Sequence, residues 1–172
     1  CEAHCSFCSI FAFASGVAGQ RRWRHRSVGN IVDEIRHLYE YHGVAHFKFV
    51  DDSFLEPPRN ISWVEEFGKE IDKHLLRIKF RTQVRADRID SQVVRLLKKA
   101  GWFSTSIGVE NASETALKRM MKSASKSDNI TAVELLSAEG IYTQMGMILF
   151  DPYTTLPELF ENLAFLKEHR WP

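Results

Sequence analysis

Three cysteines stand within the first eight residues, at Cys1, Cys5 and Cys8, and the sequence has no others. An odd number at such short spacing does not suit a disulfide framework, so metal or redox chemistry is the better interpretation. Structural zinc needs four closed ligands, and His4 or His25 would have to supply the fourth. An iron–sulfur cluster held by three thiolates keeps one iron without a protein ligand. By analogy with catalytic zinc, a substrate or cofactor would bind at that open position.

Four short apolar runs, rich in β-branched and aromatic residues, predict β-strands. They are Ala45–Val50, Ile78–Val84, Trp102–Val109 and Tyr142–Phe150. The segments between them carry amphipathic periodicity or capping signals and predict helices. These helices span Val28–Tyr41, Ser62–His74, Asp90–Gly101, Ser113–Met120, Ser127–Glu139 and Thr155–His169. Because strands separated by such helices need crossover connections, the sequence predicts a parallel sheet.

Polar residues follow each predicted strand at the point where it ends. The strands run into Asp51-Asp52-Ser53, Arg85-Ala86-Asp87, Glu110-Asn111 and Asp151-Pro152. Any one of these acids could simply cap the helix that follows it. In parallel α/β architectures, however, binding sites lie at the carboxyl ends of the strands. Four such segments in succession therefore predict one binding face, and a strand preceding Cys1 would bring the cysteines to it.

The spacing Cys1-x3-Cys5-x-Phe7-Cys8 resembles the signature of the radical S-adenosylmethionine (radical SAM) superfamily, including the aromatic residue before the third cysteine. Further segments, in the same order, are similar to later parts of that family's core: Phe49–Phe54, Gly108–Glu110 with Leu117-x2-Met120-x-Lys122, and Gly146–Pro152. The resemblance implies an α/β fold, a partial parallel (β/α)6 TIM-like barrel truncated at both ends, with strands two to five present. The chain, 1–172, would be a radical SAM core domain fragment, with a cluster-binding loop at 1–26 and βα units at 27–172.

The resemblance implies an enzyme, a transferase or an oxidoreductase. A [4Fe–4S] cluster would bind the methionyl amino and carboxylate groups of S-adenosylmethionine at its open iron. The reduced cluster would cleave this cofactor to methionine and a 5′-deoxyadenosyl radical. That radical would abstract hydrogen from an unknown substrate in a methylation, a cyclisation or a similar reaction. The protein would hold the cofactor and exclude water and competing quenchers.

Residue roles follow from the same resemblance. The residues implied as cluster ligands are Cys1, Cys5 and Cys8. The residues implied at the S-adenosylmethionine site are Phe7, Asp51, Asp52, Ser53, Arg85, Glu110, Gly146 and Ile148. Phe7 and Ile148 could instead belong to the core. The segment 51–53 departs from the Gly-Gly-Glu-like sequence common at that place in the family, so the contacting atom stays undetermined.

The basic residues near these positions have two interpretations each. Arg85 could bind the methionyl carboxylate with its planar guanidinium, or it could form a salt bridge to Asp51, Asp87 or Glu110. For three further basic residues a solvated helix face is expected, and contact with a phosphate is the alternative: Lys118, Arg119 and Lys122.

Two segments point to a subfamily. The Asp-Asp-x-Phe sequence from Asp51 and the Phe-Asp-Pro-x-Thr-Thr sequence from Phe150 resemble chains with an N-terminal cobalamin-binding domain, so the parent protein would use cobalamin. One alternative is a non-catalytic metal-binding or iron–sulfur-binding module. Another is a tRNA-modifying radical SAM methylthiotransferase, which only the basic cluster Arg21–Arg26 favours.

The net charge and the hydropathy of the chain limit the classes of binding partner that are expected. The formal net charge is +1, from 23 basic and 22 acidic residues, which gives no overall field for nucleic acid or a membrane surface. No apolar run approaches the ~18 residues of a membrane span, and no secretory leader is present, so a cytoplasmic location is expected. The expected partners are a small-molecule substrate and an electron donor of the flavodoxin or ferredoxin type, with RNA a weaker candidate. The chain reads as an excerpt of a longer protein, from Cys1 to Pro172.

Overall fold

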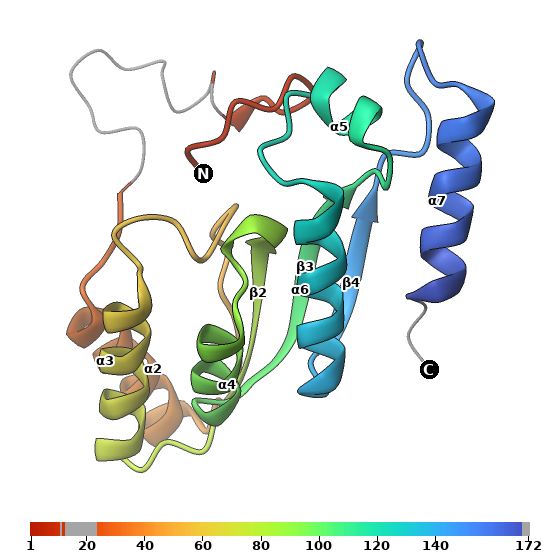
Figure 1. Cartoon of the computed structure of the whole chain (residues 1–172). Helices are drawn as coiled ribbons and strands as arrows, with labels where there is room; N and C mark the ends of the chain where they lie inside the picture. Colours follow the sequence, from red (N-terminus) through yellow and green to blue (C-terminus); the bar gives the residue numbers. More distant parts are fainter. Residues whose placement is uncertain (11, 13–23, 170–172) are drawn as a thin grey trace.

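The structure is a computed structural model that describes residues 1–10, 12 and 24–169. Within that part, one parallel sheet is formed by four strands, β1 (His46–Lys48), β2 (Lys79–Arg85), β3 (Trp102–Glu110) and β4 (Tyr142–Met147). Their spatial order is β1-β2-β3-β4, the same as their order in the chain (Figure 1). Each crossover therefore steps in the same direction, as in the wall of a (β/α) barrel. The predicted parallel α/β architecture is confirmed.

Six helices and one 3₁₀ turn connect and cover the strands in the described chain. They are α2 (Val28–His42), α3 (Ile61–Lys73), the 3₁₀ turn Ala86–Arg88, α4 (Ser91–Lys99), α5 (Glu114–Arg119), α6 (Lys126–Ala138) and α7 (Leu156–Glu168). In Figure 1, α4 and α6 lie in front of the sheet and α7 lies beyond β4. None of these helices is both long enough and apolar enough to cross a membrane.

The helix boundaries follow local capping chemistry. Gly43 ends α2 in the left-handed conformation, with φ 66°, as the His42-Gly43 sequence predicts. The Asp90 side chain accepts hydrogen bonds from two backbone N–H groups and begins α4. The carboxylate of Glu158 accepts from the N–H of Thr155, at an N···O distance of 2.9 Å, and begins α7. These three predicted boundaries are confirmed.

Two predicted helix starts and two strand ends are wrong by one to three residues; one of these strand ends is that of β1, which ends at Lys48 and not at the predicted Val50. Asn60, not Ser62, caps α3, because its side chain accepts from the N–H of Trp63. The helix predicted from Ser127 begins at Lys126, since Ser125 forms a reciprocal capping box with Asp128. Strand β4 ends at Met147, three residues before the predicted Phe150.

Side chains along the strands alternate between a buried side of the sheet and a polar side. Large side chains such as Phe80, Trp102 and Ile107 are buried beneath the helices. We call the opposite side the inner face of the sheet. It consists of Arg81, Gln83 and Arg85 of β2, Ser106, Gly108 and Glu110 of β3, and Gln144 and Gly146 of β4.

Arg119 ties α5 to α7. Its guanidinium donates to Asp151 in the loop after β4, at an Nη2–Oδ2 distance of 2.8 Å, and to Glu158 of α7, at an Nη1–Oε1 distance of 2.9 Å. Hydrogen bonds from Arg119 lower the pKa of both carboxyl groups. The expected solvated face is therefore wrong for Arg119, whereas Lys118 beside it is exposed as predicted.

Replacing Arg119 with Gln should lower the melting temperature of the chain at pH 7. The loss should shrink as the pH falls below about 4, near the ordinary pKa values of Asp and Glu. The sign follows from the lowered folded-state pKa values of Asp151 and Glu158: their contribution is present above the unfolded pKa and is lost as the pH falls through the folded one. The melting temperatures of the wild-type protein and the variant are compared from pH 7 to pH 3, with Lys118→Gln as the control. An equal loss at pH 3 and pH 7 would contradict the assignment.

Candidate functional site

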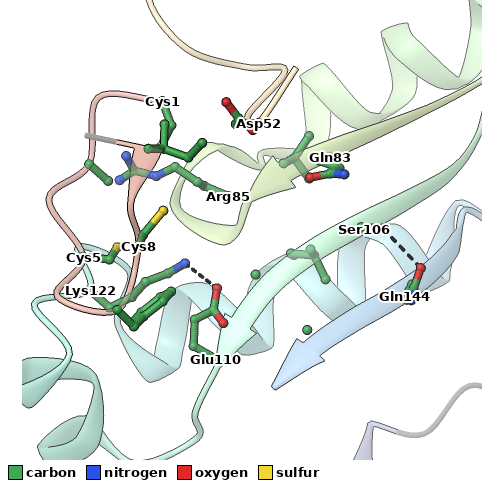
Figure 2. Close-up of a pocket in the computed structure, with 17 residues that line it drawn as sticks. Cys1, Cys5, Cys8, Asp52, Gln83, Arg85, Ser106, Glu110, Lys122 and Gln144 are labelled. Atoms are coloured by element: carbon green, nitrogen blue, oxygen red, sulfur yellow. Dashed lines mark hydrogen bonds and ion pairs between the residues drawn. The ribbon is translucent and has the colours of Figure 1, made fainter. Parts of the chain in front are cut away.

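A cavity of about 360 Å³ lies between the cysteine loop and the inner face of the sheet (Figure 2). The predicted site residues that line it are Cys1, Cys5, Phe7 and Cys8 from the loop, and Asp52, Arg85, Glu110 and Gly146 from the ends of strands or the loops after them. Residues far apart in the sequence thus meet at the carboxyl ends of parallel strands, where such folds place their binding sites.

Backbone hydrogen bonds hold the cysteine loop over the sheet. The N–H of Ser6 donates to the carbonyl oxygen of Met120, at 2.9 Å, in the turn that ends α5. Near the start of the chain, the N–H of Glu2 donates to Glu56 Oε2, at 3.3 Å. A further bond from the Cys8 N–H to the Cys5 carbonyl, at 3.1 Å, closes a turn between these two cysteines. The loop is therefore attached both to the α5 turn and to the segment that follows β1.

The three thiols differ in exposure. Cys1 and Cys5 are half-buried, and Cys8 is exposed. Burial raises the pKa of the Cys5 thiol, while the positive charges of Lys122 and Arg85 act in the opposite direction. Metal binding requires the thiolate, so these two cations favour the charge state that a ligand needs.

Among the described residues, no three side chains of His, Cys, Asp or Glu converge on a point where one metal ion could bind. A four-iron cluster makes a different demand, because each thiolate binds a different iron. Three cysteines on one loop around a shared cavity, with cations beside them, fit that donor set.

Glu110 is directed into the cavity by an irregularity at the end of β3. The register with β4 shifts between Gly108 and Glu110, and Glu110 has a φ of 64°. Such a bulge redirects a side chain, and the left-handed conformation is uncommon outside glycine. The Glu110 carboxylate then pairs with Lys122, at an Oε1–Nζ distance of 3.1 Å, with side chains 15% and 6% exposed.

Gly108 makes room for this ion pair. A Cβ atom at Gly108 would lie 2.5 Å from Glu110 Oε1 and 3.0 Å from Lys122 Nζ, closer than such contacts allow. The ion pair therefore lies directly over the backbone of β3, where Figure 2 shows Lys122 and Glu110 below the cysteines.

Arg85 occupies the end of β2 and is held from two sides. Its Nε and Nη2 atoms donate to the two carboxylate oxygens of Asp87, at 2.9 and 2.5 Å. Its Nη1 lies 3.7 Å from Oε1 of Glu56, a carboxylate that is fully buried. Burial would lower the pKa of the guanidinium, but the hydrogen bond and charge of Asp87 and the charge of Glu56 outweigh it and raise that pKa. Of the salt-bridge partners that the sequence suggested for Arg85, only Asp87 is present.

The sequence profile of the radical SAM superfamily matches residues 1–163. The chain belongs to this superfamily.

Two curated relatives illustrate the match. An uncharacterised methyltransferase of Pyrococcus horikoshii is 26% identical over 169 residues, which cover 98% of this chain and 35% of the relative. The anaerobic magnesium-protoporphyrin IX monomethyl ester cyclase of Rubrivivax gelatinosus is 31% identical over 151 residues, which cover 87% of this chain and 26% of the cyclase. The chain therefore spans about a third or less of the length of these relatives.

A solved structure is similar as well. The cobalamin-dependent S-adenosylmethionine radical enzyme OxsB, with aqua-cobalamin and S-adenosylmethionine bound, superposes with a TM-score of 0.74 at 29% identity. The match covers 84% of this chain and 22% of OxsB. The partial radical SAM barrel that the sequence implied is thus the fold of the chain.

Three residues implied at the S-adenosylmethionine site do not line the cavity. Asp51 pairs instead with Arg59, at an Oδ2–Nη1 distance of 3.1 Å. Ser53 is fully buried, and its Oγ has no hydrogen-bond partner in the described part of the chain. Ile148 is half-buried and donates its N–H to the carbonyl oxygen of Glu110, at 2.6 Å. Their roles stay predictions, whereas Asp52 of the same loop does reach the cavity.

The sequence reasoning missed several residues of the site. Lys122 was expected in solvent, yet it is almost fully buried against Glu110. Glu56 belongs to no motif, and only the fold shows that it reaches Arg85. Gln83 and Ser106 also line the cavity. Their signal was the two-residue period of the strands, because Gln83 precedes Arg85 by two residues and so shares its face.

Replacing Lys122 with Met should lower the free energy of unfolding by about 2 kcal/mol, since Glu110 would keep a mostly buried charge without a partner. Adding Glu110→Gln should recover part of that loss. Lys118→Met, at an exposed position of α5, should change stability by no more than about 0.5 kcal/mol. Urea unfolding under reducing conditions measures all three proteins, and equal effects of the two lysine substitutions would show that the ion pair contributes nothing.

Proposed function

We propose that the protein containing this chain is a radical SAM enzyme whose [4Fe–4S] cluster is bound by Cys1, Cys5 and Cys8. The observation that carries the proposal is the convergence of the cysteine loop with Arg85, Glu110 and Gly146 around one cavity. A structural metal module would not need a cation, a carboxylate and an open strand surface directed at the same space. Family membership and this arrangement together favour cofactor chemistry over a non-catalytic role.

The bound cluster and S-adenosylmethionine would supply the reductive cleavage that starts radical chemistry. The chain's own residues would orient the cofactor. Arg85 uses Nε and Nη2 for Asp87, and Nη1, which lies 3.7 Å from Glu56 Oε1 without a hydrogen bond to it, would bind a carboxylate of the cofactor. Glu110 gives Oε1 to Lys122, and Oε2 accepts no hydrogen bond from the described residues, so it can accept from an ammonium or hydroxyl group.

Phe7 and Gly146 would form the walls on either side of the cofactor. Phe7 lines the cavity and is 44% exposed as a residue, as suits an aromatic side chain that is not packed into the core. At Gly146 a Cβ atom would meet only the carbonyl oxygen of Ile107, at 3.6 Å, so the protein itself does not require glycine there. Because Gly146 lines the cavity, we infer that the cofactor occupies the space beside it.

The substrate is proposed to be a small molecule, which the enzyme would methylate or cyclise. The names of the methyltransferase and cyclase relatives support these reaction classes. The likeness to OxsB supports cobalamin as a further cofactor of the whole protein. We also infer a flavodoxin-type or ferredoxin-type electron donor and a cytoplasmic location, where the cysteines would remain reduced.

The tRNA-modifying alternative gains no support. Its only sequence argument was the basic cluster Arg21–Arg26, and Arg21, Arg22 and Trp23 lie outside the described residues. Arg26, which is described, forms an ion pair with Glu34 of α2. That ion pair accounts for a basic residue at position 26 without an RNA ligand.

The enzyme proposal is tested on the full-length protein after anaerobic reconstitution. The wild-type protein should bind about four irons and, with dithionite and S-adenosylmethionine, should release 5′-deoxyadenosine or S-adenosylhomocysteine. Cys5→Ala should abolish iron retention and both products, because one of three ligands is lost. Ser6→Ala, at an exposed position of the same loop, should change neither. Iron binding without either product in the wild-type protein would contradict the proposal.

Gly146→Ala should weaken S-adenosylmethionine binding about fivefold or more, since an overpacked methyl group costs roughly 1–3 kcal/mol. Stability should barely change, because the new Cβ meets no clash within the protein. Gly68→Ala, in α3 and away from the cavity, has equally free space and serves as the matched control. Equilibrium dialysis with S-adenosylmethionine measures the affinities. Equal binding by both variants would place the cofactor elsewhere.

A further inference from the structure

The four strands distribute their charges unevenly. Among all their residues the only carboxylate is Glu110, at the carboxyl end of β3, where Lys122 neutralises it. Their cations are Lys48, Lys79, Arg81 and Arg85. Only Arg85, at the rim, has a carboxylate partner among the described residues. The inner face is therefore positively charged away from the rim.

Arg81 is the central residue of that positive region. It precedes Arg85 by four residues on β2 and so lies on the same face, about 13 Å deeper along the strand. Its Nη2 donates to Ser106 Oγ, at 2.7 Å, and to Gln144 Oε1, at 2.5 Å. Lys48 occupies the register position beside it on β1. No carboxylate in the described chain forms an ion pair with Arg81.

The hydrogen bonds around Arg81 leave donors rather than acceptors for a ligand. Because a guanidinium only donates, the atom of Gln144 that it contacts must be the oxygen, and the NH2 group of Gln144 points elsewhere. Ser106 accepts from Arg81 and donates to the same oxygen of Gln144, at 3.3 Å. The amide of Gln83 has no side-chain hydrogen bond in the described part of the chain. Gln83, Ser106 and Gln144 line the cavity, and Figure 2 shows them away from the cysteines. Arg81 contacts Ser106 and Gln144 but does not itself line the cavity.

Arg81 itself is incompletely satisfied. Its Nε is buried without an acceptor in the described chain, and Nη1 forms no hydrogen bond there. The two neutral oxygens that Nη2 contacts do not compensate the positive charge of a half-buried guanidinium. A guanidinium with unpaired donors in such a place needs an explanation. A ligand with negative charge supplies one at Nη1, which unlike Nε is not among the buried atoms, since charge-assisted hydrogen bonds are about twice as strong as neutral ones.

We propose that Gln83 and Gln144, which line the cavity, together with Arg81, which contacts Gln144, bind an oxyanion of the substrate, a carboxylate or a phosphate group, at the end of the cavity away from the cysteines. This inference rests on the proposed function and adds a substrate class to it. The substrate would carry its anionic group at one end and its reacting carbon at the rim, about 13 Å away by the rise of β2. Because Arg85 lies at the rim, the carboxylate of S-adenosylmethionine and the oxyanion of the substrate occupy separate sites.

Anion binding tests the proposal without the cluster or S-adenosylmethionine. The full-length apo protein is titrated calorimetrically with inorganic phosphate and, separately, with acetate, at constant ionic strength set with potassium chloride. At least one anion should bind the wild-type protein saturably. Arg81→Gln should weaken that binding about tenfold or more, and Arg81→Lys should weaken it less, because the charge remains but the planar fork is lost. Binding of phosphate alone or of acetate alone identifies the group.

A matched control and a second variant keep the outcome clear. Arg95→Gln removes the same charge from an exposed position on α4 and should leave anion binding unchanged. Gln144→Leu should weaken binding while keeping the Arg81 charge, and it decides the matter if Arg81→Gln fails to fold. Binding of neither anion, or equal binding by the Arg81 and Arg95 variants, overturns the proposal. Because the titration needs no S-adenosylmethionine cleavage, its failure is distinct from a failure of the enzyme assignment.

Discussion

The turn that follows α5 connects the two halves of the site. Its first carbonyl oxygen, on Met120, accepts the Ser6 N–H of the cysteine loop, and two residues later Lys122 pairs with Glu110 at the end of β3. The turn itself is tight, with Met121 at a φ of 52°. Arg119, just before the turn, fixes it to the loop after β4 through Asp151 and to α7 through Glu158. This short segment is therefore one of the two attachments, with the bond from Glu2 to Glu56, that determine where the cysteine loop lies relative to the sheet.

The ion pair between Lys122 and Glu110 over Gly108 connects the α5 turn to the carboxylate that faces the cavity. A side chain at position 108 would displace the ends of both side chains, so the bare backbone of Gly108 lets the pair lie over the strand. The bulge and the left-handed conformation of Glu110 then direct its carboxylate across the strand rather than outward. Backbone strain at a residue of this kind is found mainly at functional sites, where the surrounding contacts maintain it. Here the contact is the charge of Lys122.

The predictable parts of the fold were those set by local patterns. The strands were recognisable from their β-branched and aromatic runs, and the caps at Gly43 and Asp90 from their preference for those backbone positions. Boundaries failed where two polar residues competed for one cap, as at Asn60 and Ser62. Either side chain can accept a backbone N–H, and the choice depends on the path of the chain before the helix.

The functional site, like the fold, was predictable from the sequence only in part. The sequence alone determined the cysteine spacing, the family it signifies and the polar residues at the strand ends, because each of these depends on neighbours in the chain. Only the tertiary structure decided that Asp52 reaches the cavity while Asp51 pairs with Arg59. It also brought buried Glu56 to Arg85 and Lys122 to Glu110. Glu56 and Arg85 come from separate βα units, whereas Lys122 and Glu110 lie on either side of α5. The free energy of pairing two charges depends on a distance and a burial that only packing sets.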